Sequence, residues 1–226
     1  LLSVNQAKKD AYMVGIPRDL WVKYDEPCYG SAAKINAVYQ CYSDMGKDDA
    51  AGSKALISKV SEVTGVDVQY YAHVNYSVVR DAVNAVGGVD VTIPDYDPGA
   101  PGIYDPNFDW KCNYTCKMVY YKDGERVHMD GEHALAFARA RNGEGGYGLP
   151  QGNFNREKDQ QIVLVALKDK ALSVGTLTNF VAVTKLLDAM GSNLRTNFET
   201  AEIRTVMSLA GDIKTDAIHS IDLNKD

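Results

Sequence analysis

The alternation of apolar and polar residues divides the first half of the chain into short strands and helices. Tyr12 to Ile16 is an apolar run closed by Pro17, which predicts a buried strand that ends in a turn. Asp48 to Thr64 carries apolar residues at helical spacing and is followed by Gly65, which predicts a helix and its stop. The same reasoning predicts a strand at Val66 to Val74, a helix at Ser77 to Val86 and a second strand at Val89 to Ile93. This alternation predicts an α/β fold with a largely parallel or mixed sheet covered by helices.

The second half of the chain is predicted to be helical between two irregular stretches. Residues 95–123 are rich in Pro, Gly, Asp, Asn and Tyr and predict an inserted loop region, and residues 141–155 are rich in Gly. Asp130 is a good N-cap for a short helix between them. A long helix is predicted from about Arg156 to Leu172, and its apolar positions at Ile162 to Leu167 predict burial on most sides. Amphipathic helices are predicted at Asn179 to Met190 and Thr200 to Ala210.

Composition and charge narrow the possible functions. The 226 residues are 45% hydrophobic and 24% charged, which is typical of one large globular domain or one domain with a helical annex. A net charge of -6 excludes a general attraction to nucleic acid, so an anionic ligand needs a local basic pocket. The longest apolar run is far shorter than the roughly 20 residues that span a bilayer. Because residues 1–4 read as the middle of a strand, we expect an upstream segment that holds a membrane anchor.

The four cysteines fall into two local groups. Cys28 and Cys41 form one group, Cys112 and Cys116 the other, and both stand among turn-forming or aromatic residues. Four cysteines allow three disulfide pairings, and four free thiols are the alternative. A four-cysteine zinc site needs two close pairs, and Cys28 and Cys41 are too far apart to form one. We predict the disulfides Cys28–Cys41 and Cys112–Cys116, which suit a secreted protein.

Two polar motifs in the first half are candidates for chemistry. Arg18 and Asp19 follow the first predicted strand, and ligands of open α/β sheets bind at the carboxyl ends of strands. The alternative is a solvated surface turn. Lys34 begins the motif Lys-Ile-Asn-Ala and offers an ammonium group to an anion, although it is equally well an exposed lysine at a helix start.

The third candidate is the pair Arg139 and Arg141 at the end of a predicted helix. The two side chains share a face only if the chain has left the helix there, and they then form a fork of donors suited to phosphate oxygens. The alternative is a cationic helix C-terminus that complements the helix dipole. Arg156 and Gln160 lie four residues apart on the next helix and could point at the same ligand.

In their order along the chain, these motifs resemble those of the LytR-CpsA-Psr family over roughly residues 1–172. The matching segments are Ile16 to Asp19, Lys34 to Ala37, Val86 to Val91, Met129 to Glu132 with Ala134 to Ala136, Arg139 to Arg141, and Asn153 to Arg156 with Gln160 and Gln161. The resemblance implies an α/β/α sandwich with a mixed central sheet covered by helices in residues 1–172. It also implies a helical extension in residues 173–226, packed on the same domain.

The resemblance also implies an activity and a set of roles. The family moves a glycopolymer from a polyprenyl pyrophosphate carrier onto peptidoglycan or a related wall polymer, at the extracellular face of the membrane. Asp19 is expected to bind Mg²⁺, and charge on the phosphates is expected to be held by Arg18, Arg139, Arg141 and Arg156, with Lys34 and Gln160 as supporting contacts. The polyprenyl tail is expected in a tunnel lined by side chains of the long helix and the strands, such as Val163, Leu167, Val68 and Val74.

Three departures from the family pattern support alternative functions. Asn153 replaces a usual aspartate, and Asp159 stands where an arginine is common and is expected to reverse a charge near the phosphate mouth. The family's other metal-linked aspartate is expected upstream of Leu1. These departures keep open a non-catalytic wall protein that binds polyprenyl phosphate or glycan. A pyrophosphatase that transfers the lipid pyrophosphate to water is a third possibility.

Overall fold

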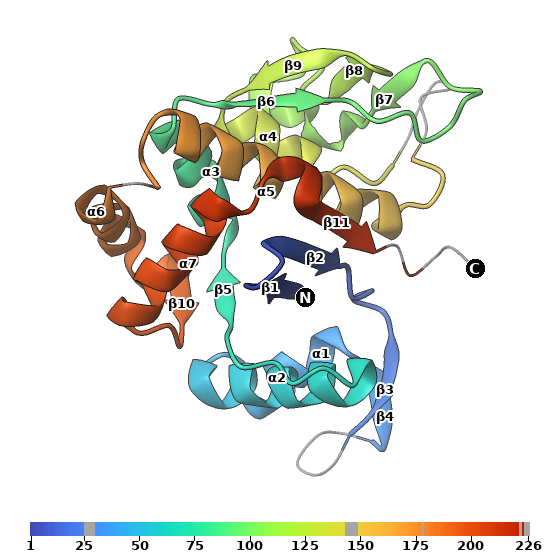
Figure 1. The fold of residues 1–226 in the computed structure, drawn as a ribbon. Helices are drawn as coiled ribbons and strands as arrows, with labels where there is room; N and C mark the ends of the chain where they lie inside the picture. Colours follow the sequence, from blue (N-terminus) through green and yellow to red (C-terminus); the bar gives the residue numbers. More distant parts are fainter. Residues whose placement is uncertain (25–29, 143–148, 178, 222, 224–226) are drawn as a thin grey trace. The chain divides into compact units, whose positions relative to one another are not determined.

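The chain has a mixed α/β fold, as the residue pattern predicts (Figure 1). The computed structural model describes residues 1–24, 30–142, 149–177, 179–221 and 223. The chain divides into two compact units. Unit 1 comprises Leu1–Gly15, Asn75–Asn193 and Ala201–Asp226, and unit 2 comprises Ile16–Val74 and Leu194–Thr200.

A mixed three-stranded sheet in unit 1 joins the two ends of the chain. Its strands are β1 (Leu2–Asn5), β2 (Asp10–Val14) and β11 (Ile218–Ile221). Strand β2 lies in the middle, antiparallel to β1 and parallel to β11. The strand predicted from Tyr12 therefore exists but begins two residues earlier, at Asp10, and ends at Val14. The sheet is mixed, as predicted.

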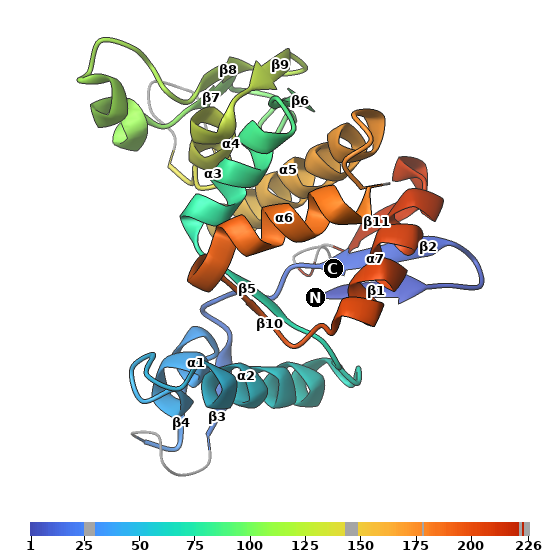
Figure 2. The same ribbon diagram turned by 90° about the vertical axis from the view of Figure 1, so that its left-hand side faces the viewer.

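The hydrophobic core of unit 1 lies between a two-stranded ladder and three helices. The elements are α3 (Tyr76–Ala85), β6 (Val89–Thr92), β9 (Arg126–Met129), α4 (Gly131–Phe137) and α5 (Asn153–Ser173). Strand β6 alternates buried and exposed residues and pairs antiparallel with β9, so its valines enter the core. Helix α3 packs on α4, and α5 packs on β6 (Figures 1 and 2). These helices agree closely with the predicted ones.

Helix α5 is buried or partly buried along most of its length. Val163 is 1% exposed and belongs to the core, whereas Leu164 is 53% exposed. Leu167 is partly buried against the core. Apart from Leu164, the residues from Ile162 to Leu167 are buried or partly buried, so the predicted burial of this segment on most sides is confirmed.

The segment predicted as an inserted loop has secondary structure of its own. It contains β7 (Gly102–Tyr104), the 3₁₀ helix η1 (Pro106–Cys112) and β8 (Tyr120–Lys122), and β7 pairs antiparallel with β8. A disulfide joins Cys112 to Cys116 at the end of η1. The other predicted disulfide, Cys28–Cys41, includes Cys28, which lies outside the described residues. We call residues 95–123 the insert.

The C-terminal part of unit 1 is mainly helical, as predicted. It contains α6 (Phe180–Met190), η2 (Gly191–Asn193), α7 (Thr200–Asp212) and η3 (Thr215–Ala217). Helices α6 and α7 match the two amphipathic patterns. The domain boundary predicted near residue 172 remains a prediction.

Unit 2 combines two small ladders with two helices. Strands β3 (Trp21–Lys23) and β4 (Ala32–Lys34) form one antiparallel pair, and β5 (Ala72–Val74) and β10 (Leu194–Thr196) form the other. Helices α1 (Asn36–Tyr42) and α2 (Asp49–Thr64) pack on each other. Asp48 caps α2, and Gly65 ends it as predicted. The strand predicted from Val66 is shorter than expected, because only its last three residues pair with β10.

Candidate functional site

The two arginines of the Arg-Ala-Arg motif lie where the backbone leaves helix α4. The helix ends at Phe137, so Arg139 and Arg141 stand on non-helical backbone. Ala140 between them is fully buried, while Arg139 is half-buried and Arg141 is exposed. Arg139 lies in the turn that ends α4, and Arg141 lies beyond that turn. Whether both side chains serve one ligand stays a prediction.

Aromatic rings hold the guanidinium group of Arg139. Its central carbon lies 4.1 Å from the ring centroid of Tyr76, the first residue of α3, and 5.6 Å from that of Phe108 in η1. A guanidinium is attracted to ring faces, and its N–H groups point outward in its own plane. Arg139 is thus positioned by ring contacts that use none of its hydrogen-bond donors.

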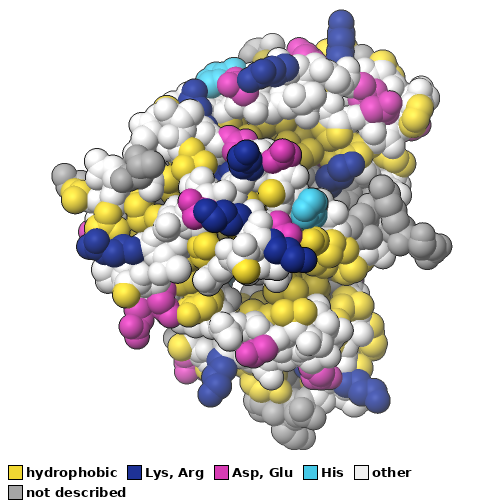
Figure 3. Space-filling model, viewed as in Figure 1, with side chains coloured by type: hydrophobic (Ala, Val, Ile, Leu, Met, Phe, Trp, Pro, Cys, Tyr) yellow, Lys and Arg dark blue, Asp and Glu magenta, His cyan; other side chains and the backbone are white. Residues whose placement is uncertain are grey.

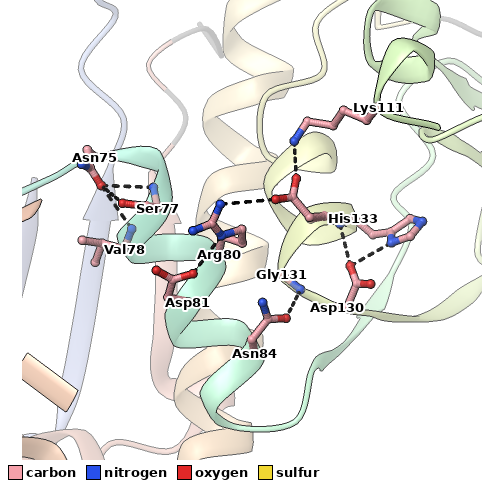
Figure 4. Close-up of polar contacts among 11 residues, drawn as sticks. Asn75, Ser77, Val78, Arg80, Asp81, Asn84, Lys111, Asp130, Gly131 and His133 are labelled. Carbon is pink, nitrogen blue, oxygen red and sulfur yellow. Dashed lines mark hydrogen bonds and ion pairs between the residues drawn. The ribbon is translucent and has the colours of Figure 1, made fainter. Parts of the chain in front are cut away.

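Helix α4, which precedes the arginines, is fixed at its N-terminus by polar contacts (Figure 4). Asp130 caps the helix by accepting a hydrogen bond from the backbone N–H of His133. The N–H of Gly131 donates to Asn84 of α3 over 2.8 Å, and a Cβ at Gly131 would lie 2.2 Å from the carbonyl oxygen of Arg80. The Asp-Gly-Glu sequence thus permits the close approach of α3 and α4.

Glu132 extends this anchor to the insert. Its carboxylate forms ion pairs with Lys111 of η1 and with Arg80 of α3, as Figure 4 shows. Both cations hold the pKa of Glu132 below its usual range, with the Lys111 contact as the largest cause. The α4 N-terminus therefore connects α3, α4 and the insert within unit 1.

Gln160 and Arg156 lie on the first turns of α5. The side-chain amide of Gln160 donates to the carbonyl oxygen of Ala138, 3.3 Å away, and Ala138 directly precedes Arg139. Arg156 is half-buried, and its Nε atom is shielded from solvent. The structure thus brings Gln160 to the arginine segment, and Arg156 lies one turn before it on the same helix.

Asp159 does not occupy the position that the sequence suggests. Its side chain is fully buried rather than placed in a phosphate mouth, and its Oδ1 accepts a hydrogen bond of 2.7 Å from the Tyr96 hydroxyl. Burial raises the pKa of this carboxyl well above its ordinary value, which favours the neutral acid. Burial of Asp159 therefore counts against the expectation that it reverses a charge near the phosphates. Asn153 is the first residue of α5.

The other predicted site residues form a cluster in unit 2. Lys34 Nζ lies 2.9 Å from Asp19 Oδ1, and Arg18 Nε lies 3.6 Å from the same oxygen. Lys34 ends β4 opposite Trp21 of β3, and the N–H of Ile35 donates to the carbonyl oxygen of Leu20. This backbone pairing places the Lys34 side chain beside the turn that carries Arg18 and Asp19. All three side chains are roughly half-exposed.

The family can now be identified by comparison with known proteins. The sequence model of the LytR_cpsA_psr family matches residues 1–226. The chain belongs to the LytR-CpsA-Psr family. It is 30% identical over 203 residues to the polyisoprenyl-teichoic acid–peptidoglycan teichoic acid transferase TagV of Bacillus subtilis (strain 168), a match that covers 89% of this chain. The chain spans 44% of the length of that relative.

Solved structures of similar proteins have the same fold. The crystal structure of B. subtilis TagV superposes with a TM-score of 0.68 at 24% identity and covers 100% of this chain and 75% of its own. A structure of TagT bound to LI-WTA superposes with a TM-score of 0.66 at 23% identity and covers 97% of this chain and 69% of its own. These likenesses support the α/β fold of the LytR-CpsA-Psr proteins for this chain.

The structure divides the residues matched to the family motifs into two sets. Unit 1 carries the arginine pair with Arg156 and Gln160, and unit 2 carries the cluster around Asp19. Three residues outside the predicted site, Tyr76, Phe108 and Asp105, contact the arginine segment from elsewhere in unit 1. Asp105 had a visible signal, because an aspartate directly before Pro106 is typical of a helix N-cap.

The residues chosen for the lipid tunnel do not form one wall within either unit. Val163 is packed in the core of unit 1, whereas Val68 and Val74 belong to unit 2, where Val74 is 42% exposed. A pocket of about 390 Å³ in unit 1 has a different lining, which includes Lys117, Met118, Tyr121, Val127, His128, Asp130 and His133. The lining of the lipid tunnel therefore stays a prediction.

The described residues show how charge and apolarity are distributed. On the face of unit 1 shown in Figure 3, the described Lys and Arg side chains are interspersed with Asp and Glu and form no continuous basic patch. Within the same described residues, no helix combines the length and apolarity that a membrane crossing requires.

Proposed function

We propose that the chain is the catalytic part of a glycopolymer transferase. The donor is a glycopolymer linked to a polyprenyl pyrophosphate, and the acceptor is a hydroxyl group of peptidoglycan or a related wall polymer. The reaction takes place at the extracellular face of the membrane to which the whole protein is anchored. Family membership and the name of the B. subtilis relative, a teichoic acid transferase, support this assignment.

One observation of the structure carries the proposal: the guanidinium of Arg139 held by two rings, two residues before the exposed Arg141. Two guanidinium groups suit a pyrophosphate, because Arg binds phosphate oxygens through paired hydrogen bonds. Gln160 supports the segment through Ala138. We propose that Arg156 and the cluster around Asp19 also act on the donor, with Arg18 and Lys34 as phosphate contacts.

The proposed transfer forms one phosphodiester and breaks one phosphoanhydride. The acceptor hydroxyl oxygen attacks the phosphorus bonded to the sugar, and the bond from that phosphorus to the bridging oxygen breaks. Polyprenyl phosphate leaves with the electron pair, and the hydroxyl proton is released. Negative charge grows on the phosphate oxygens during this step, so fixed cations that stabilise it supply much of the catalysis.

We propose Mg²⁺ as the metal, with Asp19 as its ligand from the chain. Among the residues that the structure describes, no group of three or more His, Cys, Asp or Glu forms a metal cage. A single half-exposed carboxylate fits Mg²⁺, which is commonly bound by one or two carboxylates while water and substrate phosphates complete its shell. When bound, the ion would neutralise charge on the pyrophosphate.

The burial of Asp159 weakens one argument for the alternative function, a non-catalytic wall protein that binds polyprenyl phosphate or glycan. That alternative relied in part on a negative charge of Asp159 among the phosphate-binding groups, and this side chain is buried against Tyr96. A pyrophosphatase shares the same donor chemistry and differs only in its acceptor, which is water.

A transfer assay separates these functions. Purified chain, labelled lipid-linked polymer, Mg²⁺ and isolated peptidoglycan are incubated, and the label is followed into three fractions. Covalently attached label indicates a transferase, released water-soluble label a pyrophosphatase, and label recovered unchanged with the protein a binding protein. Attachment that is absent under conditions in which B. subtilis TagV transfers its polymer would contradict the proposal.

The arginine pair is tested by Arg139→Ala and Arg141→Ala. Each change removes a charged hydrogen-bonding group worth about 1.5 to 3 kcal/mol, so affinity for a polyprenyl pyrophosphate should fall by roughly tenfold to a hundredfold. Titration calorimetry measures the affinity. The matched control is Arg126→Ala, which removes an exposed arginine of strand β9 in the same unit and should leave the affinity unchanged. Equal affinities of all variants and the unaltered chain would exclude the pair from the site.

A further inference from the structure

One side of the 3₁₀ helix η1 contacts the segment that carries the arginines. A 3₁₀ helix has three residues per turn, so residues three apart lie on one side of it. Asp105 at the N-cap, Phe108 and Lys111 follow this spacing. Asp105 contacts the backbone of Arg141, and Phe108 contacts the guanidinium of Arg139. Lys111 contacts the carboxylate of Glu132. The insert thus touches α4 and its extension at three successive turns.

Asp105 uses both carboxylate oxygens in this contact, although it is only 1% exposed. Its Oδ2 accepts hydrogen bonds from the backbone N–H groups of Arg141, at 3.1 Å, and Asn142, at 3.3 Å. Its Oδ1 accepts from the backbone N–H of Asn107, at 3.1 Å, and from the Asn107 side-chain amide, at 2.6 Å. The carboxylate therefore ties the start of η1 to the backbone that presents Arg141.

We propose that Asp105 is a positioning residue for the arginine pair, and that η1 acts as the support that sets where Arg139 and Arg141 meet the pyrophosphate. Asp105 fixes the backbone after Arg139, and Phe108 covers one side of the Arg139 guanidinium. This inference rests on the proposed function, because it assigns the arginines to the donor phosphates.

The chemistry of the contact requires a carboxylate. Four N–H groups converge on the two oxygens of Asp105, and an ionised carboxylate has an acceptor on each side. An asparagine has one oxygen and one NH₂ group, so one pair of N–H donors would face another donor. Asp105→Asn is therefore nearly the same size but cannot hold both η1 and the backbone at Arg141.

Asp109 provides a matched control in the same 3₁₀ helix. It is also buried, and its oxygens accept hydrogen bonds from the Tyr104 hydroxyl and the backbone N–H of Met118, each over 2.9 Å. All of these partners lie within the insert. Asp109→Asn therefore disturbs the insert itself without removing a bond to the arginine segment.

The first experiment measures binding of geranylgeranyl pyrophosphate to the chain by titration calorimetry in the presence of Mg²⁺. Asp105→Asn should weaken binding by about tenfold or more, since a buried charged contact is lost, while Asp109→Asn should stay within about twofold of the unaltered chain. Amide hydrogen exchange should be faster at Arg141 and Asn142 in Asp105→Asn, and faster at Met118 in Asp109→Asn. Equal losses of affinity in both variants would overturn the positioning role.

A double-mutant cycle distinguishes positioning from general weakening of the fold. If Asp105 acts through Arg141, then Asp105→Asn should cause little further loss of affinity in a chain that already carries Arg141→Ala. Additive losses would contradict the proposal. If Arg141→Ala alone leaves binding unchanged, the proposed pyrophosphate site is wrong. If Arg141→Ala weakens binding and Asp105→Asn does not, only the positioning role is wrong.

A milder variant keeps the proposal testable if Asp105→Asn does not fold. Phe108→Leu retains an apolar side chain in the core but removes the ring from the Arg139 guanidinium. The affinity for geranylgeranyl pyrophosphate should fall by about twofold to fivefold, in line with a cation–π contact. No loss in this variant, with the fold intact by circular dichroism, would refute the role of η1 as a support for Arg139.

Discussion

The buried carboxyl of Asp159 makes a testable prediction about stability. Its Oδ1 accepts the hydrogen bond from Tyr96, whereas its Oδ2 is buried without a hydrogen-bond partner among the described residues. Burial raises the pKa of Asp159 well above its ordinary value of 3.8, against smaller opposing effects of the Tyr96 hydrogen bond and Lys158. Asp159→Asn keeps an oxygen that can accept the hydrogen bond from Tyr96, and it removes the ionisable carboxyl group.

The sign of the pH dependence follows from comparing the folded and unfolded chains. In the unfolded chain Asp159 ionises near its ordinary pKa of 3.8, whereas in the folded chain it holds its proton to higher pH. Its contribution to stability is therefore fully present below pH 3.8 and is lost as the pH rises through the raised, folded-state pKa. Asparagine does not ionise, so Asp159→Asn should raise the free energy of unfolding by about 1 kcal/mol or more at neutral pH, and much less in acid.

Urea unfolding followed by circular dichroism measures this difference at about pH 4 and about pH 7.5. Asp109→Asn is the contrast, because both oxygens of Asp109 accept hydrogen bonds and the change should destabilise the chain. The reasoning would be refuted if Asp159→Asn were less stable than the unaltered chain at both pH values. That result would mean that the folded chain stabilises an ionised Asp159.

Two further predictions concern local structure. Gly131→Ala should lower the free energy of unfolding by about 1 to 3 kcal/mol, because its Cβ would meet the Arg80 carbonyl oxygen at 2.2 Å. Gly99→Ala is the control in thermal unfolding, since its Cβ would make an ordinary 3.4 Å contact, and equal stabilities would show that α3 and α4 can separate without cost. Mass spectrometry of non-reduced peptides from secreted protein should show Cys112 linked to Cys116 and Cys28 linked to Cys41. Four alkylatable thiols would contradict this prediction.

Much of the candidate site could be read from short segments of the sequence. The helix stop before Arg139 follows from the residues around it, and Asp130 is a visible N-cap. Lys34 and the Arg18-Asp19 turn were separate candidates, and the β3–β4 pairing brings them together. The role of Asp159 was misread, because its position along the helix gives no measure of burial, and its partner Tyr96 lies 63 residues away.

The sequence by itself determined where the longer helices and the strands β1, β2, β5 and β6 lie, and which arginines stand close together along the chain. These properties depend on periodicity, caps and turn residues within a few positions of one another. Only the tertiary structure decided that β2 pairs in parallel with β11 from the other end of the chain. It also decided that Asp105 binds the backbone of Arg141, 36 residues away. Such contacts depend on how distant segments bury their apolar faces and satisfy their polar groups together, and no local pattern records which segments will meet.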